Sequence, residues 1–220
     1  MPARLTTSSY AVLGMLTLGP WSGYELAQQA QRSLRFVWPK SASHLYAEPK
    51  KLVDLGLATV RIESAGESRT RQVYEITPAG RDAFRDWLGT EPAAPHLEVE
   101  AMVRVFFADQ GDRDELLHVL EVFESQVQAV YQAGVTQLQQ TLDGQVIYPE
   151  RLHLIALYAS FQGDFYRLML NWIAFARGEV SGWDSTVGIG LTERTRHLLE
   201  EAAAGRSVLP EADKDKDKDS

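Results

Sequence analysis

Apolar residues in the first ninety positions recur with two different spacings, one typical of helices and one typical of strands. Apolar positions three and four apart predict a helix over Ser8–Leu18, which Pro20 ends. Ser22 follows with Glu25 three residues later, a pair typical of a capping box. The sequence therefore predicts a second helix that opens at Ser22 and runs to Leu34.

A third helix is predicted inside WPKSASHLYAEPKKLVDLGL (38–57), with Ser41 or Ser43 as its N-cap and Gly56 as its stop. Pro49 lies in the middle of this segment, where it removes one backbone hydrogen bond. We expect it to kink or shorten the helix. The residues expected to dock this helix on the other two are Leu45, Leu52 and Leu55.

A period of two then replaces the helical spacing. Apolar residues occupy every second position in Ala58–Ile62 and in Tyr74–Ile76, on either side of a polar loop that contains glycine. This pattern predicts a β-hairpin. Pro78 opens a further helix after it, AGRDAFRDWL. Its inward-facing residues are expected to be Phe84 and either Trp87 or Leu88.

Beyond TEPAAPHLE (90–98), a segment whose two prolines predict a linker, the pattern is only helical. The predicted helices cover residues 97–109, 113–142, 149–178 and 192–204. Alternate steps of four and three residues follow apolar positions in the two long helices, which is typical of a coiled coil or helix bundle. These seams are Leu116, Leu120, Phe123, Val127 and Val130 in the first, and Leu154, Tyr158, Phe161, Phe165, Leu168, Trp172 and Phe175 in the second.

Three helices followed by a hairpin are the order of a winged helix-turn-helix. The expected fold class is mainly α with a small β-hairpin: a winged helix-turn-helix domain and an all-helical, coiled-coil-like dimerisation domain. The predicted domains are a winged-helix DNA-binding domain (1–90), a linker (91–96), a helical dimerisation and effector domain (97–205) and a disordered acidic tail (206–220).

Charge adds a functional indication. The chain holds 22 Lys and Arg against 30 Asp and Glu; residues 1–90 hold eleven and eight of these, which leaves eleven and 22 for the remainder. A basic functional domain joined to an acidic partner domain fits this asymmetry, and chance asymmetry of a solvated surface is the alternative. There is no Cys, no apolar run of the roughly 18 residues that a membrane span needs, and no signal-peptide core. These features predict a cytoplasmic protein.

In a winged helix, the third helix enters the major groove and the hairpin reaches the neighbouring backbone. Cationic side chains neutralise phosphates, and hydroxyls near helix starts can contact phosphate oxygens or base edges. Each candidate also has a structural alternative: helix capping, ring packing on the second helix, a solvated face, or cross-strand pairing. The candidates are Lys40, Ser41, Ser43, His44, Tyr46, Lys50 and Lys51 of the third helix, Arg69 and Arg71 of the hairpin, and Ser22 and Tyr24 of the second helix.

The aromatic stripe of the last long helix is a candidate effector site, with helix core or dimer interface as the alternative. Its residues are Tyr158, Phe161, Phe165 and Trp172. Enzyme motifs are absent: the five histidines have no metal-ligand spacing, and neither a GxSxG elbow nor a complete GxGxxG occurs. The sequence therefore predicts no enzyme activity, no cofactor and no metal.

Three stretches together resemble one family: SYAVLGMLTLGPWSGYELAQQ, SASHLYAEPKKLVDLGLA and SRTRQVYEITPAGRDAFRDWL. Over residues 8–88 they are similar to the N-terminal domain of the PadR family of bacterial transcriptional regulators. Residues 97–204 are similar to the C-terminal dimerisation domain of its larger, AphA-like virulence-activator members. The sequence departs from the commoner pattern at Glu48-Pro49, where an Ala-Leu or Glu-Leu pair is expected.

The resemblance implies a homodimer that binds an inverted-repeat operator, usually as a repressor. In several members a small aromatic or hydrophobic effector relieves the binding. Two third helices would then lie about 34 Å apart, or a multiple of that. The alternative function is a protein-interaction adaptor that uses the winged helix as a scaffold without binding DNA, a reading that the overall negative charge favours.

Overall fold

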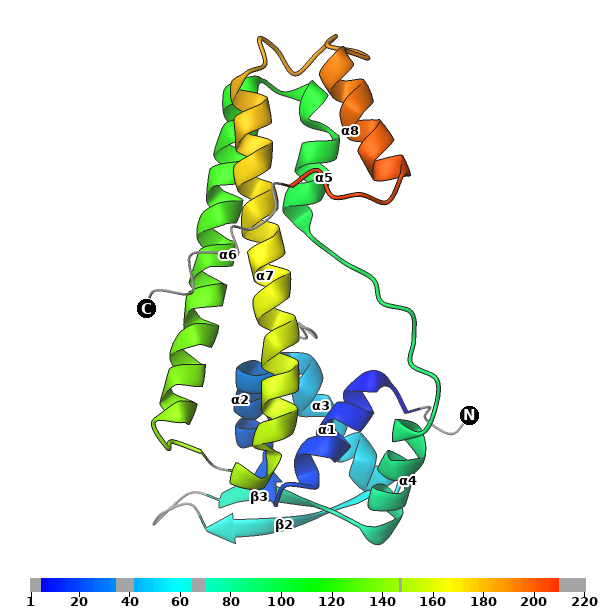
Figure 1. Ribbon diagram of the computed structural model, residues 1–220. Coiled ribbons are helices and arrows are strands. Elements are labelled where there is room, and N and C mark those ends of the chain that lie inside the picture. Colours follow the sequence, from blue (N-terminus) through cyan, green and yellow to red (C-terminus); the bar gives the residue numbers. More distant parts are fainter. Residues whose placement is uncertain (1–4, 35–41, 65–69, 147, 210–220) are drawn as a thin grey trace. The chain divides into compact units, whose positions relative to one another are not determined.

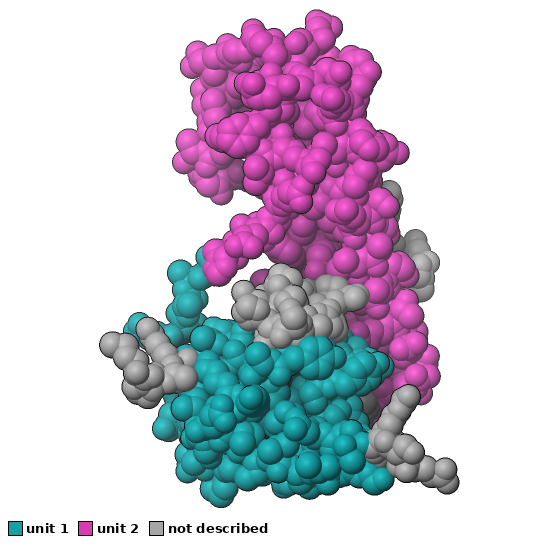
Figure 2. All heavy atoms as spheres, turned by 180° about the vertical axis from the view of Figure 1, so that it is seen from behind, with its two compact units in different colours: residues 1–95 teal, residues 96–220 magenta. Residues whose placement is uncertain are grey.

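The computed structural model describes residues 5–34, 42–64, 70–146 and 148–209, and only the backbone at positions 31 and 42–45. The chain divides into two compact units, which Figure 2 colours separately. Unit 1 is Met1–Pro95 and unit 2 is His96–Ser220.

Unit 1 is a winged helix, as the sequence predicts (Figure 1). Its antiparallel sheet has the strand order β1-β3-β2, in which β2 and β3 form the predicted hairpin with Ala58 opposite Ile76. The edge strand β1 is an addition, because two residues are too few to produce a periodic pattern. The elements are α1 (Thr7–Leu16), β1 (Trp21–Ser22), α2 (Gly23–Ser33), α3 (Ala42–Asp54), β2 (Ala58–Ser64), β3 (Thr70–Ile76) and α4 (Pro78–Leu88).

Side-chain caps fix where these helices begin. The predicted capping box of α2 is confirmed, since the Glu25 N–H donates to Ser22 Oγ at 3.3 Å and the Ser22 N–H donates to Glu25 Oε2 at 2.7 Å. Thr6 and Ser9 form a second capping box at α1. Thr77 caps α4, whose first residue is Pro78.

The core of unit 1 lies between α1, α2, α3 and the sheet. Its most deeply buried side chains are Val12, Leu13, Leu16, Leu26 and Leu52. Helix α4 packs on α1, where the rings of Tyr10 and Trp87 stack with centroids 4.7 Å apart. At Gly80 the start of α4 meets the chain before β2 so closely that a Cβ would lie 2.0 Å from the carbonyl oxygen of Leu57.

Helix α3 continues through Pro49 to Asp54, so the proline does not shorten it. The ring of Pro49 is fully buried, and the packing of this apolar ring offsets the missing backbone hydrogen bond. Because α3 begins at Ala42, Ser43 lies inside its first turn rather than at the N-cap. Gly56 has φ +71°, the left-handed conformation expected after a helix.

Helices are the only regular secondary structure in the described part of unit 2. They match the predicted helices, except that the segment predicted as one helix over 97–109 forms a shorter α-helix and a 3-10 helix. The long helices α6 and α7 lie side by side along their length (Figure 1). Asp112 and Glu115 form a capping box that opens α6. The helices are α5 (Glu100–Phe106), α6 (Arg113–Leu142), α7 (Leu152–Ser181) and α8 (Glu193–Ala203), with short 3-10 helices at Ala108–Gln110 and Pro149–Arg151.

The core of unit 2 occupies one end of the α6–α7 pair. From α6 it takes Leu116, Leu120, Phe123 and Val127, four residues of the predicted seam. From α7 it takes Ile173, Ala176 and Val180, none of which is on the predicted seam. Of the predicted α7 seam, Trp172 packs against this core, whereas Leu154, Phe161 and Leu168 are exposed. Among the described residues from 128 to 172, none is buried.

Candidate nucleic-acid interface

Helix α3 has an inner and an outer face. Glu48, Pro49 and Leu52 are buried against the core, whereas Tyr46 and Lys50 are exposed. Ser43 is seven positions before Lys50, so the backbone of the helix places it on the same outer side. Among the described residues, no carboxylate pairs with Lys50. The outer face of α3 therefore presents an aromatic hydroxyl and a free ammonium group.

Lys51 faces α1 instead. Its Nζ donates to Ser9 Oγ at 3.1 Å and lies 3.6 Å from Glu48 Oε2, and its side chain is only 25% exposed. The Ser9 hydroxyl in turn donates to Glu48 Oε2 at 2.7 Å. The sequence predicts both lysines on the outer side, and the structure leaves only Lys50 there.

The start of α2 lies next to the middle of α3. A Cβ on Gly23 would be 3.5 Å from the ring of Tyr46, so this ring covers the first residue of α2. Ser22 is buried as the N-cap of α2, in agreement with its structural alternative. Tyr24 is exposed, and its hydroxyl accepts a hydrogen bond from Gln28 Nε2 at 3.4 Å. Tyr24 and Tyr46 thus place two phenol groups at this junction.

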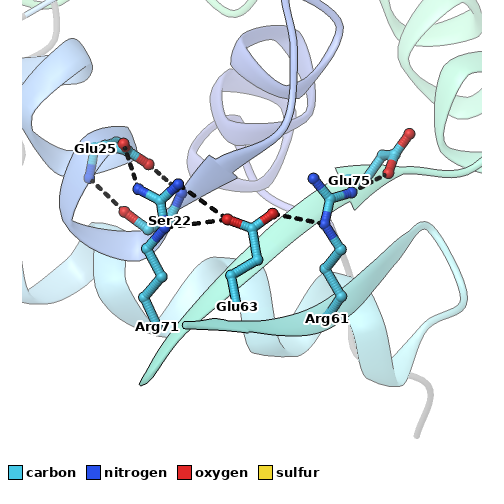
Figure 3. A network of polar contacts seen from close by, with 6 residues as sticks. All are labelled: Ser22, Glu25, Arg61, Glu63, Arg71 and Glu75. Carbon is cyan, nitrogen blue, oxygen red and sulfur yellow. Dashed lines mark hydrogen bonds and ion pairs between the residues drawn. The ribbon is translucent and has the colours of Figure 1, made fainter. Parts of the chain in front are cut away.

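An ionic network joins the loop end of the β2–β3 hairpin to α2 (Figure 3). Arg71 Nη2 lies 3.0 Å from Glu63 Oε2, its directly opposite residue in the hairpin, and Arg71 Nη1 lies 3.0 Å from Glu25 Oε1. Arg61 binds the other oxygen of Glu63 at 2.9 Å and Glu75 at 2.8 Å. Arg71 therefore has the cross-strand role that the sequence leaves as its alternative.

The network sets the charge and the acid response of this end of the hairpin. Hydrogen bonds from Arg61 and Arg71 lower the pKa of Glu63, and the Ser22 backbone N–H is the main cause that lowers the pKa of Glu25. Stability from these carboxylates is full above their ordinary pKa and is lost as the pH falls through the lower folded value. Among the described residues, three carboxylates face two guanidinium groups here, so these side chains do not form a cationic patch in the free protein.

Several predicted contacts lie where the structure gives no side chain. Lys40, Ser41 and Arg69 fall outside the described residues, and so do tail residues 210–220. At Ser43 and His44 only the helical backbone is described. Sequence reasoning missed Glu48, although a signal exists: it stands four residues before Leu52 and three after Leu45, on the predicted apolar face.

The four effector candidates are spread along one helix. The rings of Phe161 and Phe165 stack with centroids 6.2 Å apart, and Phe161 is exposed. Partial burial raises the pKa of Tyr158 to about 12, and its hydroxyl has no hydrogen-bond partner among the described residues. A hollow of about 240 Å³ between α5 and α6 is lined by other residues, including His118 and Phe123. None of the four candidates lines this hollow, and Trp172 packs against the core of unit 2 instead.

The described residues form neither a metal-binding cluster nor a membrane-spanning helix. They contain no group of three or more His, Cys, Asp and Glu side chains placed to hold a metal ion. None of the helices in the same ranges is both long and apolar enough to cross a membrane.

Comparison with known proteins places these features in a family. Residues 12–86 match the model of the Transcriptional regulator PadR-like family. The chain is 31% identical over 131 residues to the negative transcriptional regulator PadR of Bacillus subtilis (strain 168), an alignment covering 59% of this chain and 70% of the relative.

Solved structures share the fold. The crystal structure of Bacillus subtilis PadR with operator DNA has a TM-score of 0.66 and 22% identity, covering 80% of this chain and 99% of that one. Its complex with p-coumaric acid has a TM-score of 0.61 and 21% identity, covering 79% and 98%. The Vibrio cholerae virulence activator AphA has a TM-score of 0.51 and 18% identity, covering 80% and 98%.

Proposed function

Because this chain belongs to the PadR-like family of transcriptional regulators, we propose that it binds operator DNA through unit 1 and represses transcription as a homodimer. The observation that carries the proposal is the outer face of α3, where Tyr46 and Lys50 are exposed beside the start of α2. In a winged helix this face enters the major groove. Lys50 supplies a phosphate-neutralising charge, and the tyrosines supply hydroxyl donors for the backbone.

The relatives support the same reading. Bacillus subtilis PadR has been solved with operator DNA, and the structural alignment covers 99% of that chain. The curated relative is a negative regulator, which supports repression. A complex of Bacillus subtilis PadR with p-coumaric acid supports release of DNA by a small aromatic effector. We place the effector near the stripe of Tyr158, Phe161, Phe165 and Trp172.

Dimerisation is supported by the exposed half of the α6–α7 pair. Leu154, Phe161 and Leu168 are seven residues apart, so they form one line along α7, and all three are exposed in the single chain. An apolar line of this kind is typical of an interface. A second copy that covers it would gain roughly 25 cal/mol for each Å² of apolar surface buried.

The proposal is tested by selecting genomic DNA fragments with the purified protein and sequencing them. We expect an inverted repeat whose half-site centres are about 34 Å apart, or a multiple of that. Phenolic acids and multi-ring hydrophobic compounds added to the complex are expected to release the enriched fragments. A pool without any inverted repeat would contradict the operator proposal. Absence of DNA retention at low salt would favour the protein-interaction adaptor.

Lys50→Ala and Lys51→Ala are expected to differ, although the two residues are neighbours. Loss of one phosphate contact should lower the slope of log K against log [salt] by about 0.9 in Lys50→Ala, for operator and unrelated DNA alike. Lys51→Ala should leave the slope unchanged, because Lys51 is held by Ser9 and Glu48. Fluorescence anisotropy from about 50 to 200 mM salt measures both slopes. Equal slopes for the two variants would contradict this assignment.

A further inference from the structure

A buried acid on the inner face of the groove-facing helix has no role in the proposed contacts. Glu48 is only 9% exposed. It lies on the same inner side of α3 as Pro49 and Leu52, which are apolar and fully buried. Burial of a carboxylate is unfavourable unless hydrogen bonds and a counter-charge compensate it. Glu48 obtains both from α1 and α3, through Ser9 and Lys51.

The Ser9 hydroxyl is the centre of this cluster. It donates to Glu48 Oε2 at 2.7 Å, and it accepts from Lys51 Nζ at 3.1 Å and from the Thr6 backbone N–H at 3.0 Å. A hydroxyl has one proton and two lone pairs, so its hydrogen-bonding capacity is fully used. Because Ser9 is also the N3 residue of the α1 capping box, the cluster joins the first turn of α1 to the middle of α3.

The position of the cluster along α3 is mechanically important. Pro49 follows Glu48 directly and has no N–H to donate to the carbonyl four residues earlier. The N-terminal turns of α3, which would meet the DNA, are therefore joined to the rest of the helix by one hydrogen bond fewer than usual. Glu48 lies at this weakened point of α3 and accepts a hydrogen bond from Ser9 of α1.

A hydrogen-bonded carboxylate fixes the orientation of a helix more narrowly than an apolar side chain would. Buried ion pairs add little net stability compared with well-packed hydrophobic residues, but their hydrogen bonds have defined lengths and angles. Base-edge hydrogen bonds in the major groove demand the same precision, and a phosphate contact made by a flexible lysine does not. Loss of the cluster would thus weaken binding to the operator sequence more than binding to unrelated DNA.

We propose that Glu48 is a positioning residue for operator recognition: through Ser9 and Lys51 it sets the orientation of α3 on α1, without touching DNA. The proposal rests on the DNA-binding function proposed above. It assigns a role to Glu48, the first residue of the Glu48-Pro49 pair at which the sequence departs from the commoner pattern of the family.

The test compares Glu48→Ala, Glu48→Gln and Ser9→Ala with the wild type. The probes are the genomic fragment that the wild-type protein enriches most and an unrelated duplex of equal length. For Glu48→Ala we expect the Kd of the enriched fragment to rise at least 10-fold, with the Kd of the unrelated duplex unchanged within about two-fold and the salt slope unchanged. The Kd of Glu48→Gln for the enriched fragment should lie between those of the wild type and Glu48→Ala, because the glutamine amide oxygen can still accept a hydrogen bond from Ser9 Oγ.

A role in stability alone would give another result. All variants that remain folded by circular dichroism at the assay temperature would then bind both duplexes like the wild type, which would overturn the proposal. Equal losses on both duplexes would overturn it as well. Glu48→Gln keeps the test valid should Glu48→Ala fail to fold. Lys50→Ala is the matched control, since it should weaken both duplexes together. If the wild type itself shows no preference for the enriched fragment, the proposed function fails first.

A double-variant cycle adds an independent readout. Ser9→Ala and Glu48→Ala remove the same hydrogen bond, so the loss of operator affinity in the combined variant should be clearly smaller than the product of the two single losses. Multiplicative losses would mean that the two residues act separately, and this too would overturn the proposal.

Discussion

Replacing Phe161 and Leu168 together by glutamate is expected to convert the proposed dimer to a monomer and to raise the operator Kd by a factor of about 100 or more. The two side chains are 60% and 55% exposed in the single chain and contribute nothing to the core of unit 2, so each chain should stay folded. In a dimer they would be covered, and an unpaired carboxylate there is costly. Loss of the second winged helix removes the bivalent gain on an inverted repeat.

Sedimentation velocity gives the mass of the variant, and fluorescence anisotropy gives its affinity. The control is the double variant Ala156→Glu and Ala174→Glu, which adds the same charge at two exposed positions of α7. At 100° per residue these positions lie on a side of the helix away from Phe161 and Leu168. This control should remain dimeric. A dimeric Phe161→Glu, Leu168→Glu protein would contradict the proposed interface.

Gly80→Ala is expected to lower the free energy of unfolding of unit 1 by about 3 kcal/mol. The added methyl group would lie 2.0 Å from the Leu57 carbonyl oxygen and 2.9 Å from Ile76 Cγ1. The nearer atom belongs to the backbone, so α4 has to move away from the chain before β2. That movement also strains the cap, in which the Gly80 N–H donates to Thr77 Oγ1 at 3.0 Å. Urea denaturation measures the loss.

Gly134→Ala is the matched control. A Cβ at Gly134 meets nothing within 4 Å, and the residue lies inside α6. Alanine there should stabilise the helix by about 0.5–1 kcal/mol, since it restricts the unfolded chain and favours helical backbone. The opposite signs separate overpacking from a general effect of the substitution. A Gly80→Ala protein as stable as the wild type would show that the contact with Leu57 relaxes freely.

Sequence periodicity predicted the helices well but could not choose between two apolar stripes on α7. Stepping by fours and threes follows the largest side chains, among them Phe161 and Leu168. The stripe that packs on α6 consists of smaller residues, Ile173, Ala176 and Val180. A helix with apolar residues on more than one side does not specify which side meets its own chain, since that choice depends on tertiary packing.

The candidate site shows a similar division. The capping pair Ser22 and Glu25 was predictable, because its geometry is local. The partners of Lys51 and Arg71 were not, since Ser9 lies 42 residues before Lys51 and Glu25 lies 46 residues before Arg71. Neighbouring residues on a helix point about 100° apart, so only one of Lys50 and Lys51 can face directly outward. Only the fold shows which one does.

Residues 91–99 form neither helix nor strand, and each unit closes a core of its own. Additions or deletions in this stretch therefore cost little stability, because the entropy of a flexible connection changes slowly with its length. In a regulator with two units joined in this way, two properties can evolve separately. In the proposed operator complex, substitutions on α3 would alter which bases are preferred, while changes in the connecting stretch would alter which half-site separations are reached. New regulatory targets are then acquired without simultaneous redesign of both units.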